Sequence, residues 1–352
     1  MTKTEVSPEY QTSASPRRKA TILDVASAAG VSYATVSRYL NGNPHVSGKA
    51  AERIASAIQA VNYIPNKAAQ SLVRRRTQTV AFVIHGLPNA ITEDPNIMPI
   101  LLSANRTLSS AGYQLVTLLS DSPHAQERII HLASGGFADG WIINTYRKGD
   151  PFFEALERIN VPIAVSGVGY GASTPFPAVD IDNESASYNL TQHVRQRGRR
   201  RIAYICGPSS LPCSDTRLRG FRNAMGPDYD PSLVVRARDW TKDDGRDALL
   251  RLGPDLSQRA DALICASDCL AAGAMHHLIS AGVRIPDDLA VAGFDDGFDA
   301  LATHPQLTTV HQPLADYGVA LSTMILNQIE NHTFERTVLL PTSLVTRAST
   351  GE

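Results

Sequence analysis

The chain has 352 residues, of which 43% are hydrophobic and 19% are charged, with 33 Lys and Arg against 34 Asp and Glu. This length is sufficient for two or three domains with sizeable cores. The near-neutral total hides an asymmetry, because residues 1–76 hold eleven Lys and Arg against four Asp and Glu. The remaining residues hold 22 against 30. A basic N-terminal segment joined to an acidic remainder indicates a polyanionic partner that binds at one end of the chain only.

The same totals argue against a membrane or exported protein. No apolar run approaches the ~20 residues of a membrane span, and residues 1–20 contain no hydrophobic export segment. We therefore expect a cytoplasmic protein with no membrane partner. The four cysteines are expected to be reduced, buried thiols. Cys265 and Cys269 lack further cysteine or histidine ligands nearby, so we predict neither a metal site nor a cofactor.

Residues 1–20 are rich in Ser, Thr and Pro and include the run Pro16-Arg17-Arg18-Lys19. This composition predicts a disordered N-terminal arm. The arm either touches phosphates of the polyanionic partner or is a solvated tail without a role.

The stretch 21–40 predicts two short helices joined by a tight turn. Thr21 can cap the first helix in an approximate capping box with Asp24. Gly30 can end it, because a C-terminal turn needs the positive φ that glycine adopts easily. Ser32 can cap the second helix, which runs from Tyr33 to Leu40. The pattern fits a helix-turn-helix, although an ordinary pair of helices in a globular domain would look the same.

A third helix is expected over about 48–62. From residue 77 the sequence pattern changes to apolar runs separated by amphipathic segments. Strands are predicted at 79–84, 114–119, 140–144, 162–166, 201–206, 233–235, 262–266 and 289–294. Helices are predicted near 99–111, 125–133, 152–159, 185–197, 215–225, 243–252, 269–281 and 313–330. Continuous apolar strands that alternate with helices indicate parallel sheets covered on both faces, here in two successive sets.

Several strings in the first 72 residues carry a family resemblance. They are DVASAAGVSYATVSRYLNG, HVS, NYIPN and AAQSL. With them, and with similarity that continues to the C-terminus, the chain resembles the LacI/GalR family of bacterial transcriptional repressors.

The resemblance implies a small all-α helix-turn-helix DNA-binding domain joined to an α/β effector domain. The effector domain would contain two doubly wound parallel-sheet subdomains, like a periplasmic binding protein. The predicted order is an arm (1–20), a headpiece (21–66), a hinge helix and linker (67–77), and an effector-binding and dimerisation domain (78–352). The N-subdomain would hold about 78–180 and 312–340, and the C-subdomain about 181–311 and 341–352. Crossings between them are expected near 179–181, 309–312 and 339–342.

The DNA contacts follow from groove geometry and from the resemblance. Tyr33 and Ala34 begin the second helix, where side chains meet base edges, and Arg38 can make a bidentate contact with guanine. Asn66 and Leu72 belong to a segment that resembles the family's hinge helix, in which Leu72 would wedge into the minor groove. The residues suited to phosphate contacts are Ser32, Thr35, Ser37, Asn41 and His45.

Effector contacts are expected at the carboxyl ends of the parallel strands, where open α/β sheets bind ligands. The GFDD string gives Asp295, and Arg217 opens a string that resembles the family's R-x-x-G-F motif. Trp240 either stacks on a sugar ring or fills the core. His85 either faces the cleft or caps a helix. The predicted effector-binding set is His85, Arg217, Trp240, Ser267, Asp295 and Gln312.

Two positions depart from the family pattern. Ser267 stands where an Asn is common, and Gly167 stands where some sugar-responsive members carry a carboxylate. The effector is therefore expected to be handled differently from that of the best-known members. The predicted function is a homodimeric repressor of a carbohydrate operon that releases a pseudo-palindromic operator when a sugar-like effector binds. Because no heptad pattern follows residue 344, a dimer is expected rather than a tetramer.

Two other classes of protein fit the sequence less well. A sugar-binding receptor would not need the basic N-terminal segment and would normally carry an export signal. An α/β enzyme would need a nucleophile, an acid/base pair or a cofactor loop. The glycines of 166–171 alternate rather than following G-x-G-x-x-G, and no phosphate loop or nucleophile elbow occurs. The chain is accordingly predicted not to be an enzyme.

Overall fold

The computed structural model describes residues 19–41, 44–64, 76–86, 94–147, 149–168 and 174–351. Its contacts divide the chain into Met1–Arg76 and Thr77–Glu352, here called the head unit and the body unit. Residues 1–18 of the predicted arm, and the hinge residues Asn66 and Leu72, lie outside the described ranges. In those ranges no helix is both long enough and apolar enough to cross a membrane.

The described part of the head unit contains three helices, α1 (Ile22–Ala29), α2 (Tyr33–Leu40) and α3 (Gly48–Ala60). Thr21 caps α1, and Asp24 completes the predicted capping box. Gly30 ends α1 at a φ of 62°, the left-handed conformation that its position predicted. Ser32 caps α2 by accepting a hydrogen bond from the Thr35 amide. The helix-turn-helix read from the sequence is thus confirmed in its local chemistry.

The core of the head unit is small. Val25 of α1, Val36 of α2 and Ile54 of α3 are fully buried against one another. Side chains on the opposite face of α2 are left at the surface, so that helix is free to present them to a partner.

The first lobe of the body unit, here called the N-lobe, is built on a six-stranded parallel sheet in the order β11-β5-β4-β3-β1-β2. Its strands are β1 (Thr79–His85), β2 (Gln114–Ser120), β3 (Gly140–Asn144), β4 (Ile163–Ser166), β5 (Ala178–Ile181) and β11 (Thr337–Leu340). Its helices are α6 (Ile97–Ser110), α7 (Pro123–Ser134), α8 (Pro151–Glu157) and α15 (Leu314–Ile329).

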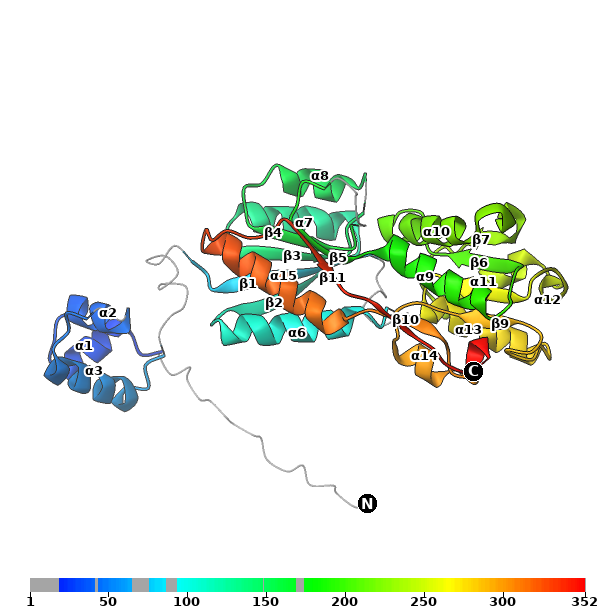
Figure 1. Ribbon diagram of the computed structural model, residues 1–352. Helices are drawn as coiled ribbons and strands as arrows, with labels where there is room; N and C mark the ends of the chain where they lie inside the picture. Colours follow the sequence, from blue (N-terminus) through cyan, green and yellow to red (C-terminus); the bar gives the residue numbers. More distant parts are fainter. Residues whose placement is uncertain are drawn as a thin grey trace, which may run out of the picture. The chain divides into compact units, whose positions relative to one another are not determined.

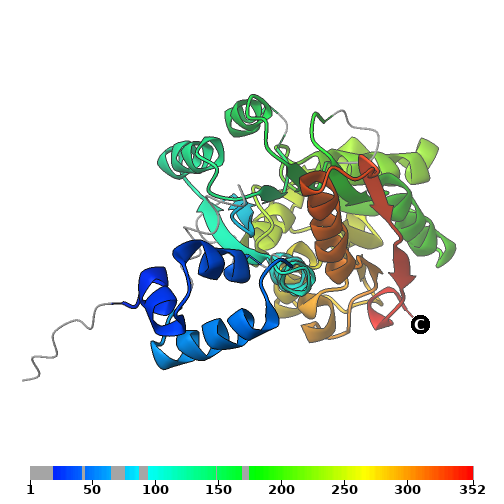
Figure 2. The same ribbon diagram turned by 90° about the vertical axis from the view of Figure 1, so that its left-hand side faces the viewer.

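The alternation along β1 shows how this sheet is covered. Val80 and Phe82 belong to the core cluster that includes residues of α6 and α15. Ala81 and Val83 belong to the cluster with α7 and α8. Both faces are therefore buried, as the continuous apolar strands predicted, and Figures 1 and 2 show the helices on the two sides of the sheet.

The second lobe, here called the C-lobe, has a four-stranded parallel sheet in the order β7-β6-β8-β9. Its strands are β6 (Ile202–Cys206), β7 (Val234–Arg236), β8 (Ala262–Cys265) and β9 (Ala290–Ala292). Its helices are α9 (Asn183–Gln196), α10 (Pro212–Met225), α11 (Lys242–Leu252), α12 (Leu256–Arg259), α13 (Asp268–Ser280) and α14 (Phe298–Ala302). Short 3-10 turns lie at Gly226–Asp228, Pro231–Leu233 and Ala348–Thr350.

The chain passes between the lobes three times. It leaves the N-lobe sheet after β5 and enters α9, and it returns through β10 (Thr309–His311) into α15. It leaves again after β11 through β12 (Ser343–Val345), which pairs antiparallel with β10. Figure 1 shows these two strands between the lobes, so the second and third crossings lie side by side.

The strand and helix types expected from the sequence agree with the structure, with ends shifted by a few residues. The helix expected at 48–62 ends at Ala60, and the helix expected near 99–111 begins at Ile97. Strands β5, β10, β11 and β12 and helices α12 and α14 were not predicted as elements, and each is only three to five residues long. Such short segments show no periodicity that distinguishes them from loops.

The close packing of α15 on α6 depends on a glycine. A Cβ at Gly318 would lie 2.0 Å from Ser103 Oγ and 2.3 Å from the Ile100 carbonyl oxygen. Gly318→Ala should therefore destabilise the body unit by about 1–3 kcal/mol, the usual cost of overpacking. Thermal unfolding of the full chain would show a lower Tm. Gly297→Ala is the matched control, since a Cβ there meets nothing within 4 Å. Equal melting of both variants would contradict this packing account.

Candidate functional site

A cleft between the lobes collects side chains from the carboxyl ends of strands in both sheets. From the C-lobe it receives Arg217, Trp240, Ser267 and Asp295, and from the return crossing it receives Gln312. Five of the six predicted effector residues thus line one cavity, whose volume is about 100 Å³.

Arg217 lies at the centre of this cleft and is almost fully buried, with 6% of its surface exposed. Its Nε donates to Asn183 Oδ1 at 2.8 Å, and its Nη1 donates to the Ala266 carbonyl oxygen at 2.6 Å. The guanidinium also lies 3.7 Å from the ring centroid of Phe294. A buried cation requires such partners, because desolvation alone would be prohibitive.

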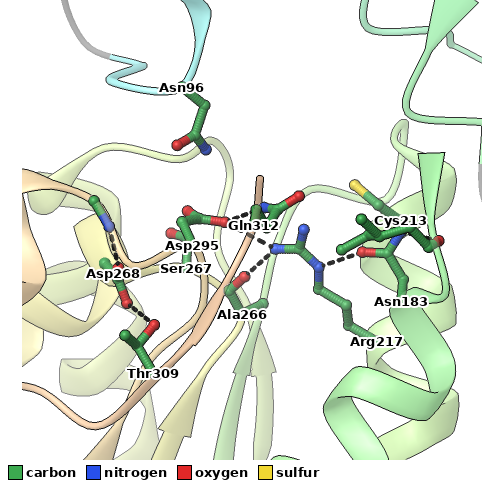
Figure 3. A network of polar contacts seen from close by, with 12 residues as sticks. Asn96, Asn183, Cys213, Arg217, Ala266, Ser267, Asp268, Asp295, Thr309 and Gln312 are labelled. Carbon is green, nitrogen blue, oxygen red and sulfur yellow. Dashed lines mark hydrogen bonds and ion pairs between the residues drawn. The ribbon is translucent and has the colours of Figure 1, made fainter. Parts of the chain in front are cut away.

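Asp295 supplies the charge partner. Its Oδ1 lies 3.6 Å from Arg217 Nη1 and accepts a hydrogen bond from Gln312 Nε2 at 2.5 Å. Burial raises the pKa of Asp295, while Arg217 and the side-chain amides of Asn96 and Gln312 oppose the rise. Figure 3 shows Asp295 between Gln312 and Ser267, with Asn96 facing it from the other side.

The backbone at Asp295 is held in an unusual conformation. Its φ is 122°, a region that non-glycine residues rarely adopt and that costs of order 1–3 kcal/mol. The Asp295 amide donates to the Val310 carbonyl, and the Gln312 amide donates to the Asp295 carbonyl. The strand that returns to the N-lobe therefore fixes the carboxylate in place.

Trp240 and Ser267 have both structural and cleft-facing surfaces. The Trp240 ring packs so closely on Gly207 that a Cβ there would lie 2.0 Å from it. Ser267 Oγ accepts the Leu270 amide and caps α13. The two alternatives considered for Trp240 are therefore compatible, since one face of the residue packs on the C-lobe while the residue also lines the cleft.

Sequence reasoning missed the side of the cleft contributed by the N-lobe. Asp94 and Asn96 come from the loop before α6, while Asn144 and Ser166 end β3 and β4. The carboxyl-end rule could have found Asn144 and Ser166, as it found Asp295. Asp94 and Asn96 follow no strand directly, so no comparable signal marked them.

Asp180, Asn183 and Tyr317 form a hydrogen-bonded group in the cleft, beside the first crossing between the lobes. Asp180 Oδ1 accepts from Asn183 Nδ2 at 3.0 Å and from the Tyr317 hydroxyl at 3.2 Å. Because Asn183 also accepts from Arg217, this group joins the first crossing to the central guanidinium. The lobes are linked again at the surface, where Arg147 Nη1 donates to Ser210 Oγ at 2.9 Å.

His85 is placed differently from the other predicted effector residues. It is buried at the end of β1, bonded to Ser120 Oγ at 2.9 Å and to Asp150 Oδ2 at 2.8 Å, and stacked on Phe152. It is not among the described residues that line the cleft. Desolvation lowers its pKa, although Asp150 opposes the change. This position supports a role in holding α8, which Asp150 caps.

The cysteines are free thiols, and burial raises the pKa of each. Cys206, Cys265 and Cys269 are buried, whereas Cys213 is partly exposed and lines the cleft together with Cys269. In the described ranges no group of three or more His, Cys, Asp or Glu side chains is arranged to hold a metal ion.

A second site is the outer face of α2 in the head unit. Ser32, Tyr33, Ala34 and Arg38 are exposed there, and Thr35 and Ser37 are partly exposed. His45 is exposed in the turn before α3. Asn41 caps the end of α2 and donates through Nδ2 to the Ser37 carbonyl oxygen. Eight of the ten predicted DNA-contacting residues thus lie in the described ranges, and seven of these lie on α2 or at its caps.

Comparison with known proteins finds matches to both units of the chain. The family model for bacterial regulatory proteins of the lacI family matches residues 21–66. The model for periplasmic binding protein-like domains matches residues 191–350. The chain is 35% identical to the HTH-type transcriptional regulator CelR of Thermobifida fusca, covering 95% of this chain and 99% of the relative. It is 31% identical to the ribose operon repressor of Halalkalibacterium halodurans, with coverages of 94% and 97%.

Solved structures of transcriptional regulators also match most of the chain. A transcriptional regulator CelR–cellobiose complex matches with a TM-score of 0.73 and 33% identity, covering 94% of this chain and all of that chain. A lac repressor dimer bound to operator and the anti-inducer ONPF matches with a TM-score of 0.82 and 28% identity, covering 95% and 99%.

The two units together define a DNA-binding transcriptional regulator with a two-lobed ligand-binding body. The chain belongs to the lacI family of bacterial regulatory proteins, the family that its sequence motifs indicated. The matched relatives are regulators, and the chain is accordingly a regulator rather than an enzyme.

The charges of the cleft predict a pH dependence. Desolvation, with repulsion from Asp295 and Asp239, raises the pKa of Asp94 from 3.8 to about 6, against the opposing effects of the Asn96 amide and Arg217. The folded protein therefore holds this proton more tightly than the unfolded chain. The stabilisation from this group is present at low pH and is lost as the pH rises through about 6.

Asp94→Asn removes the ionisation but keeps the shape. Its Tm relative to the parent protein should therefore increase between pH 5 and pH 7.5, measured by thermal unfolding of the full chain. Asp287→Asn, at a position 67% exposed in its side chain, is the matched control for loss of a carboxylate outside the cleft. A constant difference for Asp94→Asn would contradict the assignment.

Proposed function

We propose that this regulator represses carbohydrate-utilisation genes and leaves its operator when a sugar binds the cleft between the lobes. The observation that carries the proposal is the buried Arg217–Asp295 pair, placed where the carboxyl ends of two parallel sheets meet. The relatives include a regulator solved in complex with cellobiose and a ribose operon repressor, which supports a sugar as the effector.

The chemistry of the cleft suits a polyhydroxyl ligand. Each sugar hydroxyl can donate one hydrogen bond and accept others, and the cleft offers both kinds of partner side by side. Asp295 accepts, and Arg217 donates. The Trp240 ring offers an apolar face on which the C–H face of a pyranose can stack.

The size of the cavity couples binding to the arrangement of the lobes. Ligand pockets usually measure about 300–1,000 Å³, whereas this cavity measures about 100 Å³. In this proposal a sugar enters as the lobes move apart. Binding would then favour a lobe arrangement different from this one, and a regulator needs such a difference in affinity between two states. Induction is the proposed sign.

DNA binding is assigned to the head unit. Tyr33, Ala34 and Arg38 would meet base edges in the major groove, while Ser32, Thr35, Ser37, Asn41 and His45 would contact phosphates. Asn66 and Leu72 would act in a hinge segment at the operator centre. A protein whose partner is chromosomal DNA is placed in the cytoplasm, at the nucleoid.

The body unit carries the surface proposed for a homodimer. Large apolar side chains are exposed on α6 and α14, which lie along the same side of the body unit in Figure 1. Met98 and Leu102 are 39% and 48% exposed, and Phe298 and Leu301 are 75% and 50% exposed. Apolar surface of this kind marks protein interfaces. A two-fold dimer requires an operator with matching two-fold symmetry.

Selection from random DNA, followed by operator titration with sugars, tests the proposal. The full chain should select a two-fold-symmetric operator, and at least one sugar among cellobiose, maltose and ribose should weaken operator binding measured by fluorescence anisotropy. Binding without sequence preference would contradict the assignment of the head unit. An operator affinity unchanged by every sugar would contradict the assignment of the cleft.

The role of Arg38 is tested on the selected operator. Arg38→Ala should weaken binding by about 1–3 kcal/mol and relax the preference at one base pair in each half-site, as expected for loss of a bidentate base contact. Arg158→Ala removes the same charge from an exposed position at the end of α8 and should change neither quantity. Uniform weakening on all sequences would instead indicate a phosphate contact for Arg38.

A further inference from the structure

Charge and hydrogen-bonding capacity are distributed unevenly over the cleft. The described residues that line it include the carboxylates of Asp94, Asp180 and Asp295. In the same described set Arg217 is the only lining residue with a positive charge. An effector that enters this space meets more negative than positive charge.

Arg217 is also poorly placed to bind an anion. A phosphate or carboxylate is normally gripped by two parallel N–H groups of the guanidinium fork. Here Nε is committed to Asn183 and Nη1 to the Ala266 carbonyl oxygen. Figure 3 shows the remaining nitrogen, Nη2, on the open side of the side chain, and no hydrogen bond within the described ranges reaches it. Only a single-nitrogen contact is left for a ligand.

The N-lobe wall, here defined as Asp94 and Asn96, presents acceptors. Asp94 Oδ1 accepts the Asn96 amide at 2.9 Å, and no hydrogen bond among the described residues reaches its Oδ2. Asn96 Oδ1 is buried and has no partner in the described part of the chain. A buried acceptor without a donor is energetically unfavourable, so this wall favours a ligand that donates hydrogen bonds.

Repulsion among the carboxylates of the cleft also disfavours an anionic ligand. Burial and the neighbouring carboxylates of Asp295 and Asp239 already raise the pKa of Asp94 to about 6. The carboxylates therefore resist ionisation beside one another, and a further anion would meet the same repulsion. A phosphate group, which has few protons to donate near neutral pH, would place acceptors against acceptors.

We propose that the cleft selects uncharged sugars and excludes their phosphorylated forms, and that the N-lobe wall, through Asp94, sets this selectivity. The inference rests on the proposed function of the cleft as a sugar site. Hydroxyl groups of the effector donate to Asp94 and Asn96 and accept from Arg217 Nη2. The regulator then reports a sugar that has entered the cell without phosphorylation, upstream of any kinase step.

Matched pairs of probes test the selectivity. Operator release by the full chain is titrated at pH 7.5 with cellobiose and cellobiose 6′-phosphate, maltose and maltose 6′-phosphate, and ribose and ribose 5-phosphate. In every pair whose neutral member acts, the phosphate should be weaker by about 100-fold or more, since like-charge contacts cost several kcal/mol. A phosphate that acts within about threefold of its neutral partner, or better than it, overturns the inference while leaving the sugar site intact.

Two variants locate the selectivity. Asp94→Asn should narrow the gap between the members of an active pair by about tenfold, because one repelling charge is removed and an amide donor is gained. Asp287→Asn removes a charge from an exposed turn and should keep the parental ratio. Each variant's operator affinity without sugar serves as its own reference. A parental ratio in Asp94→Asn overturns the role of Asp94.

A separate outcome identifies failure of the underlying function. If the chain binds its operator but neither member of any pair releases it, the sugar site itself is wrong and the selectivity inference falls with it. That result differs from the equal response of both members, which removes the selectivity alone.

Discussion

The buried guanidinium of Arg217 is the interaction on which the body unit depends. It contacts Asn183 at the first crossing between the lobes, the Ala266 carbonyl at the end of β8, and Asp295 after β9. Asp295 in turn accepts from Gln312 on the return crossing. A cation at this depth must keep its partners, so a ligand that changes one contact changes the links to both crossings. A ligand that binds at Arg217 therefore also changes the contacts that set the arrangement of the lobes.

The carboxylate of Asp268 holds the segment around Asp295 to the C-lobe. Asp268 accepts from Thr309 Oγ1 at 2.6 Å and from the Gly297 amide at 2.9 Å. Burial and Asp295 raise its pKa well above the ordinary value. The strand β10 is thereby attached to α13, and the strained backbone of Asp295 lies between them. The C-lobe side of the cleft is therefore held by hydrogen bonds to the return crossing.

Much of this architecture could be predicted from the sequence. Apolar strands and a capped helix pair carry their own periodicity and capping chemistry, so α1, α2 and most of both sheets were recognised. Asp295, Arg217 and Ser267 were found because strand ends and motif strings mark them. Asp94 and Asn96 were not found, since their importance arises only when a loop of one lobe faces the other lobe across the cleft. His85 ends a strand like Asp295, but Ser120 and Asp150 bind its ring. A strand-end position alone does not reveal that partnership.

The central claim is that the effector cleft and the operator site are thermodynamically coupled. Cellobiose, or whichever sugar proves active, should be titrated into the full chain by calorimetry with and without saturating operator. Coupling is reciprocal, so the operator should weaken sugar binding by the same factor, typically about 5–150-fold, by which the sugar weakens operator binding. Equal sugar affinity in the free and operator-bound protein would contradict the account.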